Sequence, residues 1–145
     1  MWQQSLALLA ALAVGGCTGM NEEGPRATVA QPTSEELAAA AARAKFPTTM
    51  PAREAQHAFA LVNRTNGTIK IYNMGDEPIT DAKVWVNGAF MQHVNGIGAK
   101  SSAIVRFSHL YNALGKSFGS LGEPVSTVQI QTDGQLLTLQ GPASD

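Results

Sequence analysis

From Phe59 onward, apolar and polar residues alternate in short runs that are separated by turn-forming residues. A period of two places every second side chain of an extended chain on the same face, which is typical of half-buried β-strands. The residues predicted to lie on the inward faces of strands are Ile69, Ile71, Ala82, Val84, Val86, Ala103, Val105, Phe107, Val128, Ile130, Leu137 and Leu139. The pattern predicts about seven strands between Phe59 and Gly141.

Four Asn-Gly or Asp-Gly pairs interrupt these runs. They are Asn66-Gly67, Asn87-Gly88, Asn95-Gly96 and Asp133-Gly134. Such pairs adopt the positive φ angles that tight β-hairpins require. Asn87-Gly88 and Asp133-Gly134 lie between alternating runs, so we expect a hairpin at each. Residues 73–78 form a longer turn, and residues 108–115 predict at most a single helical turn. Strands at this spacing indicate a mainly β fold: a small antiparallel β-sandwich of about seven strands, with a small barrel as the second choice.

A short helix is predicted before this domain, at residues 33–46. Thr33 and Glu36 have the spacing of a capping box, the residues from Leu37 are strong helix formers, and Pro47 ends the helix. Its apolar stripe is mostly alanine and buries little area, so we interpret it as a spacer or partly formed helix. The alternative is a helix that docks on a partner. Residues 47–57 are interpreted as a linker, which places the domain at residues 59–141.

The first 19 residues contain a different signal. Leu6 to Val14 are nine consecutive apolar residues, too few to span a bilayer but typical of a secretory signal. Val14, Gly15, Gly16 and Cys17 follow, and they resemble the lipobox of bacterial lipoproteins. The resemblance implies a signal peptide at 1–16, diacylglycerol on Cys17 and a lipid-anchored tether at 17–58. The basic residues usual at the start of such signals are absent from residues 1–5.

The resemblance also implies a localisation in the cell envelope. The Asp that commonly retains enterobacterial lipoproteins at the inner membrane is replaced by Thr18, which favours the outer membrane. Separately, residues 69–107 loosely resemble the immunoglobulin-like sandwich modules of bacterial surface proteins. That resemblance implies binding or spacing rather than catalysis. The chain departs from it at Ala99-Lys100, where these modules often have glycine.

Composition excludes several classes of site. A single cysteine permits neither a disulfide within a monomer nor a thiolate metal site, and the net charge of −1 does not favour nucleic acid. Catalytic and phosphate-loop motifs are absent, so we predict no enzymatic activity and no cofactor. His57, His93 and His109 share no metal-ligand spacing. Asp76, Glu77 and Asp81 are compatible with a weak calcium-binding turn, but a solvated acidic turn is the simpler interpretation.

Four outward-facing residues form the candidate binding patch: Tyr72, Trp85, Lys70 and Lys83. If they are exposed and adjacent, the aromatic rings would anchor a ligand or partner. The first hypothesis is therefore a lipid-anchored, non-catalytic envelope module that binds a protein or saccharide. The alternatives are an accessory subunit of an envelope enzyme, or a small-ligand or metal carrier with a cavity lined by Val84, Val128 and Ile130.

Overall fold

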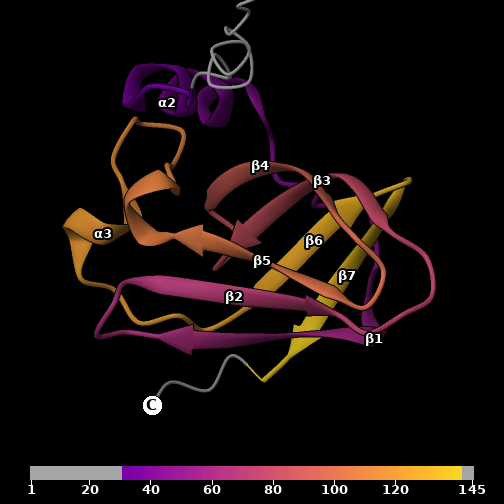
Figure 1. Ribbon diagram of the computed structural model, residues 1–145. Helices are drawn as coiled ribbons and strands as arrows, with labels where there is room; N and C mark the ends of the chain where they lie inside the picture. The colour runs from indigo at the N-terminus through magenta and orange to yellow at the C-terminus, as the bar shows by residue number, and fades with distance from the viewer. Residues whose placement is uncertain (1–30, 142–145) are drawn as a thin grey trace, which may run out of the picture. The chain divides into compact units, whose positions relative to one another are not determined.

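The computed structural model describes residues 31–141, and the predicted signal peptide and Cys17 lie outside this range. The described residues form seven strands and three short helical segments (Figure 1). The strands are β1 (Ala52–Asn63), β2 (Thr68–Asn73), β3 (Ile79–Val86), β4 (Phe90–Ile97), β5 (Ser101–Arg106), β6 (Val128–Thr132) and β7 (Gln135–Gln140). The helical segments are α2 (Ser34–Arg43), the 3₁₀ turn η2 (Phe107–His109) and α3 (Phe118–Leu121).

The strands pair in the order β4-β3-β6-β7-β1-β2-β5. The sheet is strongly curved and nearly closes into a barrel, with β1-β2-β5 as one layer and β4-β3-β6-β7 as the other (Figure 1). All pairs are antiparallel except β1 with β7, which are parallel and join the two layers. The prediction of a mainly β domain of about seven strands is confirmed, and the parallel pair is the difference from a purely antiparallel sheet.

This connectivity is close to that of immunoglobulin-like sandwiches. In the constant-type sandwich, strands 1, 2, 5 and 4 form one sheet and strands 3, 6 and 7 form the other. Here the fourth strand pairs with the third instead of the fifth, because the short turn at Asn87-Gly88 returns β4 directly alongside β3. Both residues of that turn have positive φ angles, as do Asp133 and Gly134 in the β6–β7 hairpin, so the two predicted hairpins are confirmed.

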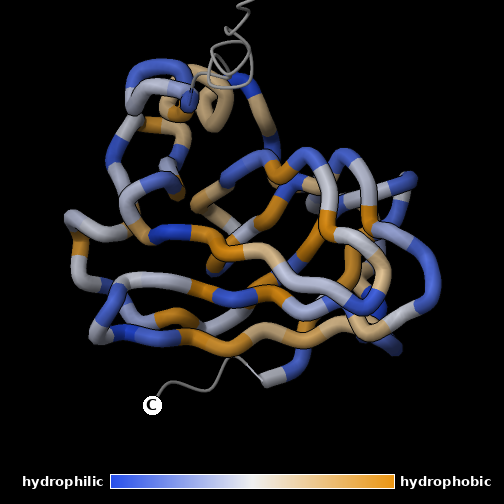
Figure 2. The backbone as a smooth tube through the Cα atoms, viewed as in Figure 1, coloured by the Kyte–Doolittle hydropathy of each residue, from blue (hydrophilic) through white to orange (hydrophobic). Residues whose placement is uncertain are grey.

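The core fills the space between the two layers. Ile69, Ile71, Val84, Val128 and Ile130 are completely buried there, as their alternation predicted. Hydrophobic residues recur along the strands and hydrophilic residues along the turns, with a periodicity that Figure 2 makes visible. Phe107 was predicted to extend β5 but instead begins η2, and its ring packs edge-on against buried Phe118 at 5.0 Å between ring centroids.

The first strand begins earlier than the sequence predicted. β1 starts at Ala52, so most of the segment interpreted as linker, including His57, belongs to the folded domain rather than to a tether ending at residue 58. The prediction missed it because Ala52–Gln56 bury only Ala55 and therefore show no hydrophobic alternation. These residues pair with β7 through backbone hydrogen bonds, which any sequence can make.

The predicted helix is present as α2, and its capping box is confirmed. The backbone N–H of Glu36 donates to Thr33 Oγ1 at 3.2 Å, and the N–H of Thr33 donates to Glu36 Oε2 at 2.9 Å. Hydrogen bonds of the Glu36 carboxylate with Thr33, first with its backbone N–H and then with its side chain, hold the pKa of Glu36 below its ordinary value.

The interpretation of α2 as a spacer was wrong, because Ala41 is buried against Trp85 and Met91. The small alanine side chains, which argued against burial, are what let the helix approach the indole closely.

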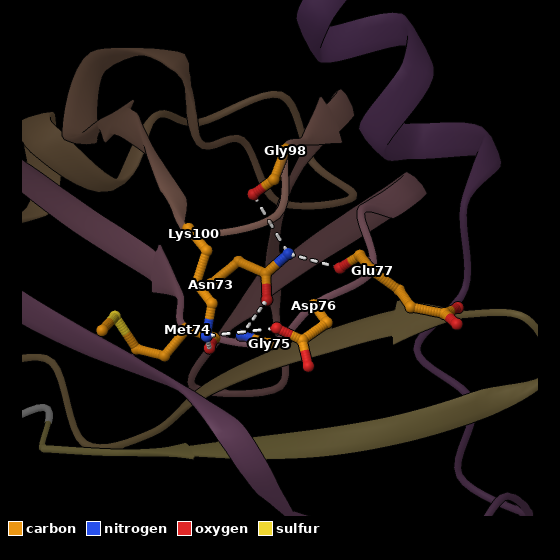
Figure 3. A network of polar contacts seen from close by, with 7 residues as sticks. All are labelled: Asn73, Met74, Gly75, Asp76, Glu77, Gly98 and Lys100. Atoms are coloured by element: carbon orange, nitrogen blue, oxygen red, sulfur yellow. Dashed lines mark hydrogen bonds and ion pairs between the residues drawn. The ribbon is translucent and has the colours of Figure 1, made fainter.

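A buried asparagine holds one end of the sandwich together (Figure 3). Asn73, the last residue of β2, is 3% exposed. Its Nδ2 donates to the carbonyl oxygens of Glu77 at 2.8 Å, Ile97 at 3.1 Å and Gly98 at 3.1 Å, while its Oδ1 accepts from the N–H of Gly75 at 3.0 Å. One side chain therefore joins the β2–β3 turn to the β4–β5 turn.

Lys100 completes this connection from the β4–β5 turn. It has a positive φ of 56° at the site where glycine is usual in the resembled modules. Its backbone N–H donates to the carbonyl of Gly75 at 3.2 Å, and its Nζ donates to the carbonyl of Met74 at 2.9 Å. Nζ also lies 3.3 Å from Asp76 Oδ1. These contacts offset the strain of the left-handed backbone.

Replacing Asn73 by alanine will destabilise the domain. The Asn73→Ala change leaves buried carbonyl groups without a donor, and we expect the free energy of unfolding to fall by about 3 kcal/mol. Urea denaturation followed by circular dichroism measures this. The matched control is Asn63→Ala, which removes one exposed hydrogen bond to the N–H of Asn66 and is expected to cost about 1 kcal/mol or less. Equal losses for both variants would show that Asn73 has no special role.

Candidate functional site

The structure does not bring the four residues of the predicted patch together. Lys70 and Tyr72 lie on β2, in the layer β1-β2-β5, whereas Lys83 and Trp85 lie on β3, in the other layer. All four side chains point away from the core as predicted, but the two pairs lie on opposite outer surfaces of the sandwich. The expectation of one adjacent aromatic patch was therefore wrong, because alternation along a strand gives the face of a residue but not the layer of its strand.

Trp85 is also covered. Its side chain is only 2% exposed, since Phe46 packs edge-on against the indole at 5.4 Å and Ala41 of α2 lies over it. The indole Nε1–H donates to Gln131 Oε1 at 3.0 Å, which satisfies its one polar group. A buried and hydrogen-bonded tryptophan is a packing residue of the domain, so Trp85 is removed from the candidate binding residues.

The outer face of the layer β1-β2-β5 is open, and we call it the exposed face. It is defined by Phe59, Leu61, Lys70, Tyr72 and Ile104. The strand register places Phe59 beside Tyr72, and places Lys70 between Leu61 and Ile104. Leu61 is 50% exposed and Ile104 is 56% exposed. Two large aliphatic side chains thus meet solvent on the same surface, on the strands that flank β2 and on either side of Lys70.

The aromatic residues of the exposed face are held in place before any partner binds. The rings of Phe59 and Tyr72 stack with 4.8 Å between centroids and 14° between planes. The Nζ of Lys70 lies 5.1 Å from the centroid of the Tyr72 ring, within the range of a cation–π contact. Such ordering lowers the entropy that these side chains lose on binding. Sequence reasoning found Lys70 and Tyr72 but missed Phe59, Leu61 and Ile104, although their alternation with inward residues was the available signal.

The other predicted chemical groups form no metal centre among residues 31–141. His93 Nε2 lies 2.6 Å from Asp81 Oδ1, and this hydrogen bond lowers the pKa of the Asp81 carboxyl. Only this one histidine meets Asp81, and both side chains are solvent-exposed. Asp76 pairs with Lys100 instead of joining Asp81 in a calcium site. Within the described part of the chain, no three His, Cys, Asp or Glu side chains are grouped to hold a metal ion.

A groove of about 540 Å³ lies where β1 shifts register against β7, between Glu54 and Phe59. It is bounded by the first half of β1, the β2–β3 turn and the start of β7. Its charged lining residues are of both signs: Arg53, Glu54, Asp76 and Glu77, with His57 on the wall. The mixed charges do not select one class of ligand.

The sequence matches no protein-family model, and no curated protein or solved structure is significantly similar to it.

Between residues 31 and 141, no helix has both the length and the apolar character needed to cross a bilayer.

A charge placed under α2 will release the helix from Trp85. Ala41 is buried and Ala42, its neighbour in the same helix, is exposed. We expect Ala41→Glu to detach α2 and expose the Trp85 indole to solvent, because an unpaired carboxylate is not accommodated against the ring. Hydrogen exchange of the Trp85 indole N–H, followed by NMR, measures this.

The matched variant Ala42→Glu makes the same substitution in the same helix, but at an exposed position. It should therefore leave the exchange of the Trp85 indole N–H unchanged. Rapid indole exchange in both variants, or slow exchange in both, would contradict the packing of α2 on Trp85.

Proposed function

We propose that this protein is a lipid-anchored envelope protein whose β-domain is a non-catalytic docking module for another protein. The observation that carries the proposal is the exposed face, where Leu61 and Ile104 meet solvent beside the stacked rings of Phe59 and Tyr72. Leucine and isoleucine at half exposure on either side of Lys70, next to ordered aromatics, form an apolar surface of the kind that marks protein interaction sites.

A protein partner fits this face better than a saccharide. Saccharide binding by aromatic residues needs a free ring face, on which the sugar stacks. The Tyr72 ring is already engaged by Phe59 and by the Lys70 ammonium. The exposed aliphatic side chains of Leu61 and Ile104 instead offer apolar contacts suited to side chains of a protein. Lys70 is the charged residue of the exposed face, so two copies that met through this face would bring like charges together, which makes self-association unfavourable.

The anchor is inferred from the resemblance of Val14-Gly15-Gly16-Cys17 to the lipobox. In this proposal the thiol of Cys17 accepts diacylglycerol and the chain is cut before it, with the outer membrane as the destination. The chain enters the described domain at Thr33, and α2 then packs on the layer opposite the exposed face. Among residues 31–141, α2 thus covers one layer and the exposed face of the other layer is left uncovered (Figure 1).

A small-ligand carrier is the second candidate function, and the groove beside β1 favours it. Its volume of about 540 Å³ lies in the range of small-molecule sites, about 300–1,000 Å³. The groove differs from the cavity that the sequence suggested, because Val84, Val128 and Ile130 are completely buried in the core.

The lipid anchor is tested by the mass of the protein purified from bacterial membranes. We expect the wild-type chain to begin at Cys17 and to carry a diacylglycerol group, and we expect the Cys17→Ser variant to keep residues 1–16 without lipid. An intact Met1 and an unmodified thiol in the wild-type chain would refute the anchor while leaving the exposed face as it is.

The docking face is tested by photo-crosslinking in intact cells. A photoreactive amino acid at Ile104 is expected to form a defined protein adduct, and Leu61→Asp should weaken adduct formation at least about tenfold by placing a charge in the interface. The control places the same photoreactive group at Leu114, which is 82% exposed but lies on another part of the surface. The same adducts from both positions, or no protein adduct from Ile104, would contradict the proposal.

A further inference from the structure

We propose that Arg64 and Arg106 form a binding site for a phosphate-type oxyanion at one end of the exposed face. Both line a shallow pocket of about 430 Å³ formed by the β1–β2 turn, the end of β5 and the loop that precedes α3. This site lies apart from the groove beside β1 and uses none of its residues. The inference does not depend on the lipid anchor.

The fold brings these two arginines together from distant parts of the sequence. Asn63 ends β1, and its Oδ1 accepts from the N–H of Asn66 at 2.9 Å, which tightens the turn that carries Arg64. Thr68 begins β2 directly after this turn, and the strand register pairs it with Arg106 at the end of β5. The turn and the strand end therefore bring Arg64 and Arg106 to the lining of the same pocket.

The floor of the pocket is rigid. Phe107 follows Arg106, and its backbone N–H donates to the carbonyl of Gly67 at 2.8 Å. A Cβ atom on Gly67 would lie 3.7 Å from the Phe107 ring, and one on Gly119 would lie 3.4 Å from the Phe107 Cβ. The turn and the α3 segment therefore both pack against Phe107, the residue that follows Arg106.

The charge of the pocket is not balanced by the protein. None of its nine lining residues is acidic: Arg64, Thr65, Asn66, Gly67, Arg106, Phe107, Ser108, Ser117 and Gly119. Among residues 31–141, neither Arg64 nor Arg106 has an ion-pair partner, although Lys100 and His93 each have one. The chain as a whole carries a net charge of −1, so this concentration of positive charge is a local feature of the fold.

The lining matches the chemistry of an oxyanion. A guanidinium group offers parallel N–H donors that fit two oxygens of a phosphate, and hydroxyl and amide groups supply further donors. Thr65, Asn66, Ser108 and Ser117 provide these groups around the arginines. Ile104 of the exposed face lies two residues before Arg106 on the same strand. Two sources supply such an oxyanion: free phosphate and a phospholipid headgroup.

The test is an NMR titration of the full chain purified in dodecyl maltoside, with sodium phosphate compared against sodium chloride at equal ionic strength. We expect saturable shifts of the Gly67 and Gly119 amides with phosphate only. Arg64→Gln and Arg106→Gln should each weaken binding about tenfold or more, because each removes charge-assisted hydrogen bonds. The matched control Arg53→Gln, at the opposite end of β1, should change the affinity less than about twofold.

A second arm distinguishes the two sources of the oxyanion. The chain is placed in phosphatidylcholine nanodiscs with or without phosphatidylglycerol. Shifts of Gly67 and Gly119 that require phosphatidylglycerol, and that Arg106→Gln removes, assign the site to a headgroup; shifts with free phosphate alone assign it to the soluble anion. Identical shifts with chloride and phosphate, or affinities that the two arginine variants do not change, would overturn the proposal. Such a failure would leave the mass of the Cys17 lipid adduct and the Ile104 crosslink unaffected.

Discussion

The side-chain amide of Asn73 is the contact on which the arrangement of the two layers depends. It ends β2 in one layer and binds the carbonyl groups where β4 leaves the other, so a single buried group closes one end of the sandwich. A buried amide that is fully hydrogen-bonded specifies one geometry, because any slip of the strands would leave it unsatisfied. The parallel pairing of β1 with β7 joins the same layers along a strand. With both connections in place, the outer surface of β1-β2-β5 is a fixed platform.

The two outer surfaces of the sandwich differ in how far residues 31–141 cover them. On the layer β4-β3-β6-β7, α2 and Phe46 cover Trp85, so the chain itself buries the apolar surface of this layer. On the other layer, no described segment covers Leu61 and Ile104. Aliphatic groups left in water gain no burial energy, so a partner that covers them binds favourably. Within residues 31–141, one outer face is thus covered by α2, and the other, which we assign to a partner, ends at two arginines that form no ion pair in this part of the chain.

Local pattern explains which parts of this structure were predictable. Alternation placed Ile69, Val84 and Val128 in the core correctly, and the Asn87-Gly88 and Asp133-Gly134 pairs located two hairpins, because both features depend on neighbouring residues. The start of β1 was not predictable in the same way, since its pairing with β7 uses backbone groups. The candidate site was predicted in part: Lys70 and Tyr72 lie on the exposed face, but Trp85 is buried. Two features depend on contacts between residues distant in sequence: the layer that each strand occupies, and the packing of α2 over Trp85. The spacing of residues along the chain does not report such contacts.

If a protein partner occupies the exposed face in the native envelope, hydrogen–deuterium exchange of the backbone amides will show it most directly. Exchange would be compared for the full chain in native membranes and for the same chain purified in detergent. A partner on the exposed face predicts slower exchange in membranes over β1, β2 and β5, with no change over β3, which α2 already covers, or over α2 itself, which lies on the other layer. Equal exchange over β1, β2 and β5 in both settings, or protection of β3 and α2 alone, would contradict the account.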